Sequence, residues 1–229
     1  VDGVRWMAVE MGFTPVFADM TFQEAQQAVL SGKADIITSL FYSDQRNERF
    51  EFTSALYEVP ASIFILAERT DIRNIHDLNG KIIAIQKGDY AGDYLESQPI
   101  RFDVLNTADF AEATDSVIAG KADAVIGDEQ IVLYHIYSQS LAGRIKKVGE
   151  PLYVGKNCMA SNKDNADLIF LLKRGIDEAR ESGVLNKISQ KWLGTQLDHQ
   201  PSLLEKYRKP VTGFIGAVII WALVAWIWN

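Results

Sequence analysis

The amino-acid sequence predicts an α/β protein built from two similar lobes. Strand-like and helix-like segments alternate along the chain, a pattern typical of α/β layers with a mostly parallel sheet. A ten-residue segment also occurs twice, 88 residues apart, as SGKADIITSL at 31–40 and AGKADAVIGD at 119–128. In each copy a helical pattern ends at glycine, the chain turns through Lys-Ala-Asp, and an apolar strand follows. The shared flanking pattern favours two related lobes over a chance match of four residues.

The individual elements follow from apolar spacing and from turn residues. Residues 22–30 have helical spacing and precede Gly32, which suits the left-handed position after a helix. Residues 110–119 show the same helical pattern and end at Gly120. The segment Asp-Leu-Asn-Gly at 77–80 predicts a turn. Three short apolar runs predict buried strands, at residues 34–40, 63–67 and 81–86.

Composition places the chain among globular proteins and excludes a nucleic-acid surface. Its 229 residues are enough for one sizeable core or two small ones, and 48% of them are hydrophobic. The net charge is −7, from 23 basic and 30 acidic residues, and no run of basic residues interleaved with aromatics occurs. Nucleic-acid surfaces are basic, so this class of partner is excluded.

Cysteine and histidine usage gives no sign of a metal or a disulfide. Cys158 is the single cysteine, so an internal disulfide and a cysteine-based metal site are both excluded. A lone cysteine is more often a buried apolar residue than a reactive thiol. His76, His135 and His199 lie far apart and lack metal-ligand spacing. We therefore expect no cofactor and no metal.

The two ends of the sequence suggest an exported domain followed by a membrane anchor. Val1 is not an initiator methionine and no signal-like segment precedes the domain, so we expect any export signal to lie outside this piece. Residues 211–228 form an uncharged run that carries three tryptophans. A buried core helix is the alternative, but the run is apolar on every side, and about 18 residues roughly span a hydrocarbon core. We expect a transmembrane helix.

Five stretches of the chain resemble one protein family in order and spacing. They cover most of residues 22–193 and read SGKADIITSLFYSDQR, FEFTSALY, DLNGKIIAIQKGDYAGDYL, AGKADAVIGDE and ESGVLNKISQKWLG. The sequence resembles the periplasmic solute-binding proteins of family 3, which serve amino acids. The resemblance is to the form used as the sensor domain of transmembrane histidine kinases or diguanylate cyclases.

The resemblance implies a type II periplasmic-binding-protein-like clamp, in which two α/β lobes enclose the ligand, followed by the transmembrane helix. A two-strand hinge would cross between the lobes at 63–67 and 156–161. Residues 1–17 would correspond to the family's first helix and second strand, so that its first strand is missing. The implied division is lobe 1 at 1–67 and 159–194, lobe 2 at 68–158, a linker at 195–210 and a transmembrane helix at 211–228.

By the same resemblance, Arg46 is the residue that grips a ligand carboxylate. A guanidinium can do so through two parallel hydrogen bonds, which lysine cannot imitate. The alternative is a surface arginine in a charged turn, and the position in the loop favours the site. Thr38 and Ser39 would offer hydroxyl and backbone groups to the ligand, and Leu40 and Phe41 belong to the same stretch.

Asp128 ends the second repeated strand, where the family places the carboxylate that receives the α-ammonium group of the ligand. An aspartate opposite an arginine is complementary to a zwitterion. The alternative role is an N-cap of a helix that begins at Glu129, since aspartate is a preferred cap. One carboxylate can serve both roles.

Gly88, Asp89 and Tyr90 precede a predicted helix at 91–97. In the family, backbone N–H groups here meet the ligand carboxylate, aided by a small hydroxyl residue that Asp89 replaces. As a helix cap Asp89 is harmless, whereas pointing at the ligand it repels a carboxylate. Aromatic candidates for a wall of the site, for each of which packing is favoured over ligand contact, are Phe41, Tyr42, Tyr57 and Tyr90.

Three functions compete for this chain. We expect a sensor in the inner membrane, with its lobes in the periplasm, a small amino-acid-like ligand as partner and a kinase or cyclase module beyond the last residue. A membrane-tethered component of an amino-acid transporter is the second. A dehydratase-like enzyme is the third, disfavoured because the sequence has no Gly-x-Ser-x-Gly elbow, phosphate loop or metal cluster. A homodimer is compatible with the sensor.

Overall fold

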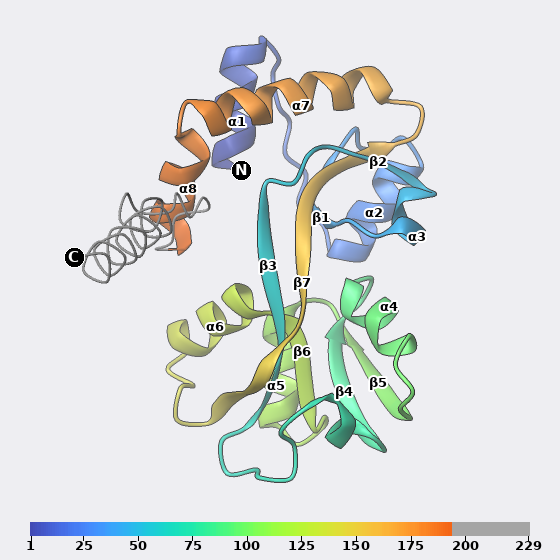
Figure 1. The fold of residues 1–229 in the computed structure, drawn as a ribbon, viewed down its shortest axis with the longest axis vertical. Coiled ribbons are helices and arrows are strands. Elements are labelled where there is room, and N and C mark those ends of the chain that lie inside the picture. Colours follow the sequence, from blue (N-terminus) through green and yellow to red (C-terminus); the bar gives the residue numbers. More distant parts are fainter. Residues whose placement is uncertain (194–229) are drawn as a thin grey trace, which may run out of the picture. The chain divides into compact units, whose positions relative to one another are not determined.

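The computed structural model describes residues 1–193 (Figure 1). Its elements, in chain order, are α1 (Asp2–Met11), α2 (Phe22–Leu30), β1 (Ile37–Phe41), α3 (Asp44–Asn47), β2 (Phe50–Phe52), β3 (Tyr57–Leu66), η1 (Ile75–Leu78), β4 (Lys81–Gln86), α4 (Tyr90–Glu96), β5 (Phe102–Thr107), α5 (Phe110–Ile118), β6 (Ala124–Asp128), α6 (Glu129–Ser138), β7 (Ile145–Asn162), α7 (Ala166–Glu181) and α8 (Val184–Leu193). The predicted linker and transmembrane helix lie outside the described residues. Within residues 1–193, no helix combines the length and the apolar character needed to cross a membrane.

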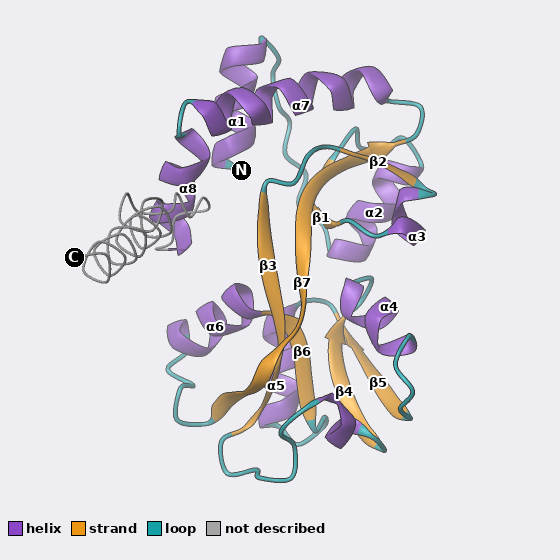
Figure 2. Cartoon of the chain, viewed as in Figure 1, coloured by secondary structure: helices purple, strands orange, loops and turns teal. Residues whose placement is uncertain are grey.

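Two long antiparallel strands, β3 and β7, connect the two lobes (Figure 2). The strand order is β1-β7-β3-β6-β4-β5, and β2 also pairs with β7. The two parallel pairs among the described strands are β4 with β5 and β4 with β6, whereas the other pairs are antiparallel. The prediction of a mostly parallel sheet was therefore wrong. The sheet is mostly antiparallel because β3 and β7 extend through both lobes in opposite directions, and their other neighbours pair antiparallel with them.

The crossing between the lobes lies earlier on both strands than the predicted hinge at 63–67 and 156–161. Residues 57–60 of β3 pair with β7 alone, and from Ala61 onward β3 pairs with β6 as well. Ile63 and Ile65 belong to the core of lobe 2. On β7, residues 157–162 already pair with β1 and β2 in lobe 1. The strands therefore cross near Ala61 and its partner Tyr153.

Lobe 2 has three layers, because its buried strands present apolar side chains to both faces. One face meets η1 and α4, whose buried Leu78, Ala91 and Leu95 complete a cluster. The other face meets α5 and α6. Successive residues of β6 alternate between the two clusters, with Ala124 and Ile126 in the first and Val125 in the second. This period of two is what a strand covered on both faces requires.

Lobe 1 packs α2 against β1, β2 and β7, and places α1, α7 and α8 together (Figure 1). The predicted helix at 22–30 is confirmed and begins with a capping box between Thr21 and Glu24. The predicted strand at 34–40 begins only at Ile37. Residues 13–21 form no strand, so the second strand expected within 1–17 is absent from the described fold. This segment lacks the backbone ladder that would define a strand.

Candidate functional site

Arg46 reaches the region between the lobes from the short helix α3. The hydroxyl of Ser43 accepts a hydrogen bond from the Arg46 backbone N–H at 3.2 Å and thereby starts α3 directly after β1. The Arg46 side chain is buried, although arginine is rarely so unless it is paired. Its Nη1 donates to the Phe41 carbonyl at 3.3 Å and its Nη2 donates to the Gly88 carbonyl at 3.0 Å.

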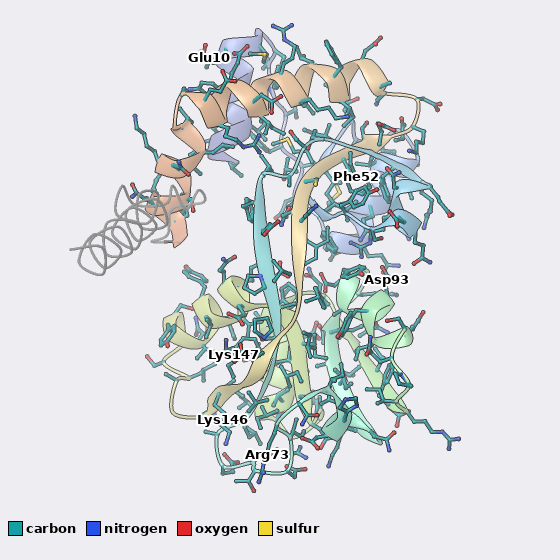
Figure 3. The ribbon with its side chains drawn as sticks, in the orientation of Figure 1. Glu10, Phe52, Arg73, Asp93, Lys146 and Lys147 are labelled. Atoms are coloured by element: carbon teal, nitrogen blue, oxygen red, sulfur yellow. The ribbon has the colours of Figure 1, made fainter. Side chains whose placement is uncertain are left out.

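Arg46 is also the ionic link between the lobes. Its Nε lies 3.3 Å from Oδ2 of Asp93, a residue of α4 that is labelled in Figure 3. Its guanidinium carbon lies 5.5 Å from the centre of the Tyr90 ring. Gln26 of α2 makes a parallel connection, because its Nε2 donates to the Gly88 carbonyl at 2.9 Å. One carbonyl of lobe 2 thus receives two side chains of lobe 1.

Asp128 lies at the end of β6 and is 7% exposed. It occupies the N-cap position of α6, but its side chain makes no capping hydrogen bond. Within residues 1–193, its buried Oδ1 has no hydrogen-bond partner. Burial, together with the negative charge of Asp89, raises the pKa of Asp128 to about 8. A carboxyl group in this state gains strongly from a partner that carries positive charge.

Asp89 caps α4, which begins at Tyr90. Its Oδ1 accepts the Ala91 backbone N–H at 2.9 Å. Asp89 is nevertheless buried beside the same cluster, and burial raises its pKa although the Ala91 hydrogen bond and the Arg46 charge both lower it. The Asp89 side chain therefore caps α4 and also lies close enough to Asp128 to influence its charge.

Four aromatic rings enclose this group of charges. Tyr153 is central, with ring centres 5.1 Å from Tyr90, 4.8 Å from Tyr94 and 6.3 Å from Phe41. The Tyr153 hydroxyl is buried and has no hydrogen-bond partner in the described part of the chain. Burial, followed by the charges of Asp89 and Asp128, raises its pKa. The Tyr153 hydroxyl therefore keeps its proton near the carboxyl groups of Asp89 and Asp128. We call Arg46, Asp89, Asp93, Asp128, Phe41, Tyr90, Tyr94 and Tyr153 the interlobe cluster.

Sequence reasoning missed Tyr153, Tyr94 and Asp93. A signal for Tyr153 is Gly155, two residues later on β7. A Cβ atom at Gly155 would lie 2.3 Å from the Phe41 ring, so the glycine makes room for that ring at the crossing. The segment Tyr153-x-Gly155 on β7 therefore combines an aromatic side chain with a glycine that admits the Phe41 ring, and this combination marks Tyr153 as a residue of the crossing.

The remaining predicted residues lie at different distances from the cluster. Ser39 donates a hydrogen bond to Asn157 Oδ1 at 2.9 Å and also hydrogen-bonds to Tyr57. The pKa of Tyr57 is raised by burial and, to a smaller extent, by the charge of Asp128. Leu40 packs in the core of lobe 1. Thr38 is half-buried on β1, and no hydrogen bond of its side chain within residues 1–193 connects it to the cluster.

Two further candidates point elsewhere. Tyr42 is 39% exposed, and its hydroxyl donates to Asp44 at 3.2 Å. Glu129 accepts hydrogen bonds from Ser62 and from Lys147, the latter at 2.9 Å. The neighbouring carboxylates of Asp128 and Glu129 therefore have separate surroundings, and the structure gives them no shared substrate position.

Comparison with known proteins gives a consistent family assignment. The profile of the family described as "Bacterial extracellular solute-binding proteins, family 3" matches residues 1–195. A relative from Bacillus subtilis strain 168, "Probable amino-acid-binding protein YxeM", is 27% identical over 172 residues, or 73% of this chain and 64% of the relative. The Escherichia coli K12 protein "ABC transporter arginine-binding protein 1" is 23% identical over 195 residues, or 84% of this chain and 79% of the relative. The chain thus spans less than two thirds of the first relative.

Among solved structures, a similar fold occurs in the "Crystal Structure of a Histidine Kinase Sensor Domain with Similarity to Periplasmic Binding Proteins". Its TM-score is 0.80 at 23% sequence identity, and the match covers 86% of each chain. At this level of identity the likeness concerns the fold.

Proposed function

The chain belongs to the bacterial extracellular solute-binding proteins, family 3, and on this premise we propose that it is the extracytoplasmic sensor domain of a transmembrane signalling receptor. It binds a small polar solute of the amino-acid type in the interlobe cluster. The observation that carries this proposal is the buried Asp128 Oδ1, which has no hydrogen-bond partner among residues 1–193. Asp128 ends β6, the strand of lobe 2 that leads into the cluster containing Arg46.

Ligand binding acts through the contacts between the lobes. The hydrogen bonds from Arg46 and Gln26 to the Gly88 carbonyl, and the Arg46–Asp93 ion pair, form only when the lobes are together. A ligand shifts such an equilibrium only by binding one state more tightly. A solute that supplies the missing partner of Asp128 does this, because it favours the state in which the cluster is assembled around it.

The sensor role is supported by the fold and by the sequence that follows it. The same fold is the sensor domain of a histidine kinase in one solved neighbour. Here α8 ends at Leu193 and is followed by the proposed linker at 195–210 and the proposed transmembrane helix at 211–228. In our proposal the lobes lie in the periplasm, and an output module such as a kinase or cyclase follows in the cytoplasm.

Binding is tested by thermal unfolding of the purified full chain against a panel of amino acids and related solutes. A solute that binds only the folded state, present at 100 times its Kd, stabilises the protein by about 2.7 kcal/mol. This corresponds to a rise of several degrees in Tm for a domain of this size. A panel in which no solute changes Tm would contradict the proposed function.

The topology is tested with the variant Ser202→Cys and a membrane-impermeant thiol reagent on intact cells. The native Cys158 is 3% exposed, and burial raises its pKa to about 11, so it contributes little labelling. The unmodified chain is the control. Labelling of Ser202→Cys before the inner membrane is broken agrees with the proposal, and labelling only afterwards excludes it.

A transport role is the second candidate, because the relatives named above include an ABC transporter binding protein. Deletion of the gene distinguishes the two. A transport component loses uptake of the radiolabelled solute, whereas a sensor leaves uptake intact and changes gene expression in response to the solute. For an enzyme on the same fold, the purified protein would convert the bound solute, which NMR of the recovered solute detects.

A further inference from the structure

The interlobe cluster contains more carboxyl groups than cationic groups. Arg46 is its single cation among the described residues, while Asp89, Asp93 and Asp128 carry carboxyl groups. The carboxyl groups of Asp89 and Asp128 are both more than nine-tenths buried. Buried carboxylates are stable only when a cation or several hydrogen bonds compensate them. The cluster therefore lacks a positive charge that a ligand can bring.

Arg46 makes no contact with Asp128, because three of its five N–H groups are directed at other protein acceptors. Nε is paired with Asp93, and the two terminal nitrogens each donate one hydrogen bond, to the carbonyl groups of Phe41 and Gly88. A ligand carboxylate that took any of these three N–H groups would compete with the contacts that the protein already makes. Two of them connect the lobes, so the competition would weaken the closed state.

Asp89 closes the other place where the family implies a carboxylate contact. Its side chain accepts the Ala91 N–H at the start of α4, which leaves this donor occupied. The negative charge of Asp89 also disfavours an anion at this position. The start of α4 is therefore not arranged to receive a ligand carboxylate in this structure, and Arg46 offers one only the N–H groups that its contacts with Phe41, Gly88 and Asp93 leave.

The groups that do lack partners suit an ammonium group. Asp128 Oδ1 and the Tyr153 hydroxyl are both buried, and neither has a hydrogen-bond partner within residues 1–193. Both are acceptors for N–H donors. The rings of Tyr90, Tyr94 and Phe41 lie around Tyr153, and the faces of such rings attract cations, most strongly where water is excluded.

We propose that the group recognised in this site is a protonated amine, received by Asp128 and the Tyr153 hydroxyl and balanced by Asp89, with no requirement for a ligand carboxylate. The ligand class is therefore organic amines, including amines that have lost the carboxyl group of an amino acid. This inference rests on the proposed function and specifies its ligand.

The test compares each amino acid with the amine of the same carbon skeleton, by calorimetric titration of the purified full chain. The pairs are alanine and ethylamine, lysine and cadaverine, and arginine and agmatine. For at least one pair, we expect the amine to bind at least tenfold more tightly than the amino acid. Glutamate, whose net charge is negative, is expected to show no binding.

Variants of Asp89 and Asp128 connect the preference to the two carboxylates. Asp89→Ser keeps a residue that caps helices well and removes the charge, so it should fold and should lower the affinity for the preferred amine at least tenfold. Asp128→Asn keeps the shape of the side chain and should do the same. Asp103→Asn on β5 is the matched control, because Asp103 is exposed and its loss should leave the affinity unchanged.

The outcomes separate this inference from the proposed function. Tighter binding of an amino acid than of its amine, or an unchanged amine affinity in Asp89→Ser, overturns the inference and leaves the proposed function standing. Binding by no amine also overturns it. If the amino acids fail to bind as well, and the wider solute panel leaves Tm unchanged, the proposed function falls too.

Discussion

The two copies of the repeated segment fold alike but end in opposite chemistry. In both copies a helix of nine residues, α2 or α5, ends before a glycine of positive φ, 73° at Gly32 and 70° at Gly120. A short strand follows in each, β1 in lobe 1 and β6 in lobe 2. The first copy leads to Arg46, whose nitrogens are all paired. The second ends at Asp128, whose Oδ1 has no partner in the described chain.

The difference comes from the neighbours of the two strands. β1 pairs with β7 alone and is only partly buried, so the chain after it is free to turn through α3 and carry Arg46 to the carbonyl groups around it. β6 lies between β3 and β4, and all five of its residues are buried. Its last residue is therefore held in the interior, where no residue of the described chain forms an ion pair with it.

This comparison shows that the same helix-turn-strand motif can lead to an ionisable side chain with protein partners or to one without, depending on the strands that surround it. The satisfied arginine connects the lobes, while the unsatisfied carboxylate is left for the ligand. Four predictions challenge that division, from the largest expected effect to the smallest.

Asp128→Ala should have the largest effect on ligand binding. Removal of a buried charge partner costs about 2–5 kcal/mol, which weakens binding by about 30-fold to several thousand-fold. Calorimetric titration with the solute identified by the thermal screen measures this. Asp103→Ala is the exposed control, and an Asp128→Ala variant that binds as the control does would remove Asp128 from the site.

Arg46→Ala should act mainly on the stability of the domain. It removes hydrogen bonds from a charged donor and leaves the Gly88 carbonyl and Asp93 with fewer partners, a loss of about 2–3 kcal/mol. Urea unfolding measures it, and the exposed Arg49→Ala on the same turn should change the free energy of unfolding by less than about 0.5 kcal/mol. Equal stability of the two variants would mean that Arg46 does not hold the lobes together.

Gly155→Ala should destabilise the crossing between the lobes. The new methyl group would lie 2.3 Å from the Phe41 ring, and such overpacking costs about 1–3 kcal/mol. The free energy of unfolding in urea gives the value. Gly143→Ala is the matched control, since a Cβ there meets no atom within 4 Å. If both variants are equally stable, the Phe41 ring is not packed on this strand.

Gly32→Ala and Gly120→Ala should have the smallest effects, and equal ones. Alanine in the left-handed region costs about 1 kcal/mol, and a Cβ at either glycine meets no atom within 4 Å. Chemical unfolding of both variants compares the two turns directly. If the two losses in the free energy of unfolding differ by more than about 0.5 kcal/mol, the helix-to-turn segments of the two copies are not equivalent.

Much of the fold was predictable because it depends on local periodicity. The strand at Lys81–Gln86 and the helix at Phe22–Leu30 match the predicted bounds. Pairing directions were not predictable in the same way, since an apolar run carries no information about the direction of its neighbour. The hinge was misplaced for a related reason, because Ile63 and Ile65 are equally apolar in a crossing strand and in a core.

The grouping of residues in the interlobe cluster was predictable where a family motif marks them and not elsewhere, and their role in ligand binding stays a prediction. Arg46, Asp89, Asp128, Phe41 and Tyr90 meet in one cluster. Tyr153 and Tyr94 belong to the same cluster but carry no signal of their own, since a tyrosine on a strand or helix is most often packing. Leu40 was placed in the site by its neighbours in sequence, yet the alternation of the strand turns its side chain into the core.

The most direct test of the account is the pKa of Asp128, followed by ¹³C NMR of aspartate-labelled protein and assigned by the signal lost in Asp128→Asn. In the free protein we expect a pKa of about 8, because the carboxyl is buried next to Asp89. A folded-state pKa above the unfolded value of about 4 means that the folded state keeps a proton which the unfolded state loses. The free energy of unfolding should therefore fall as pH rises from about 4 to 8.

Saturating agmatine or cadaverine should move this pKa well below 7, because a bound ammonium group stabilises the carboxylate. Binding near neutral pH should then release a proton. An Asp128 signal that titrates near pH 4 in the free protein would contradict the account. So would a pKa near 8 that a bound amine leaves unchanged.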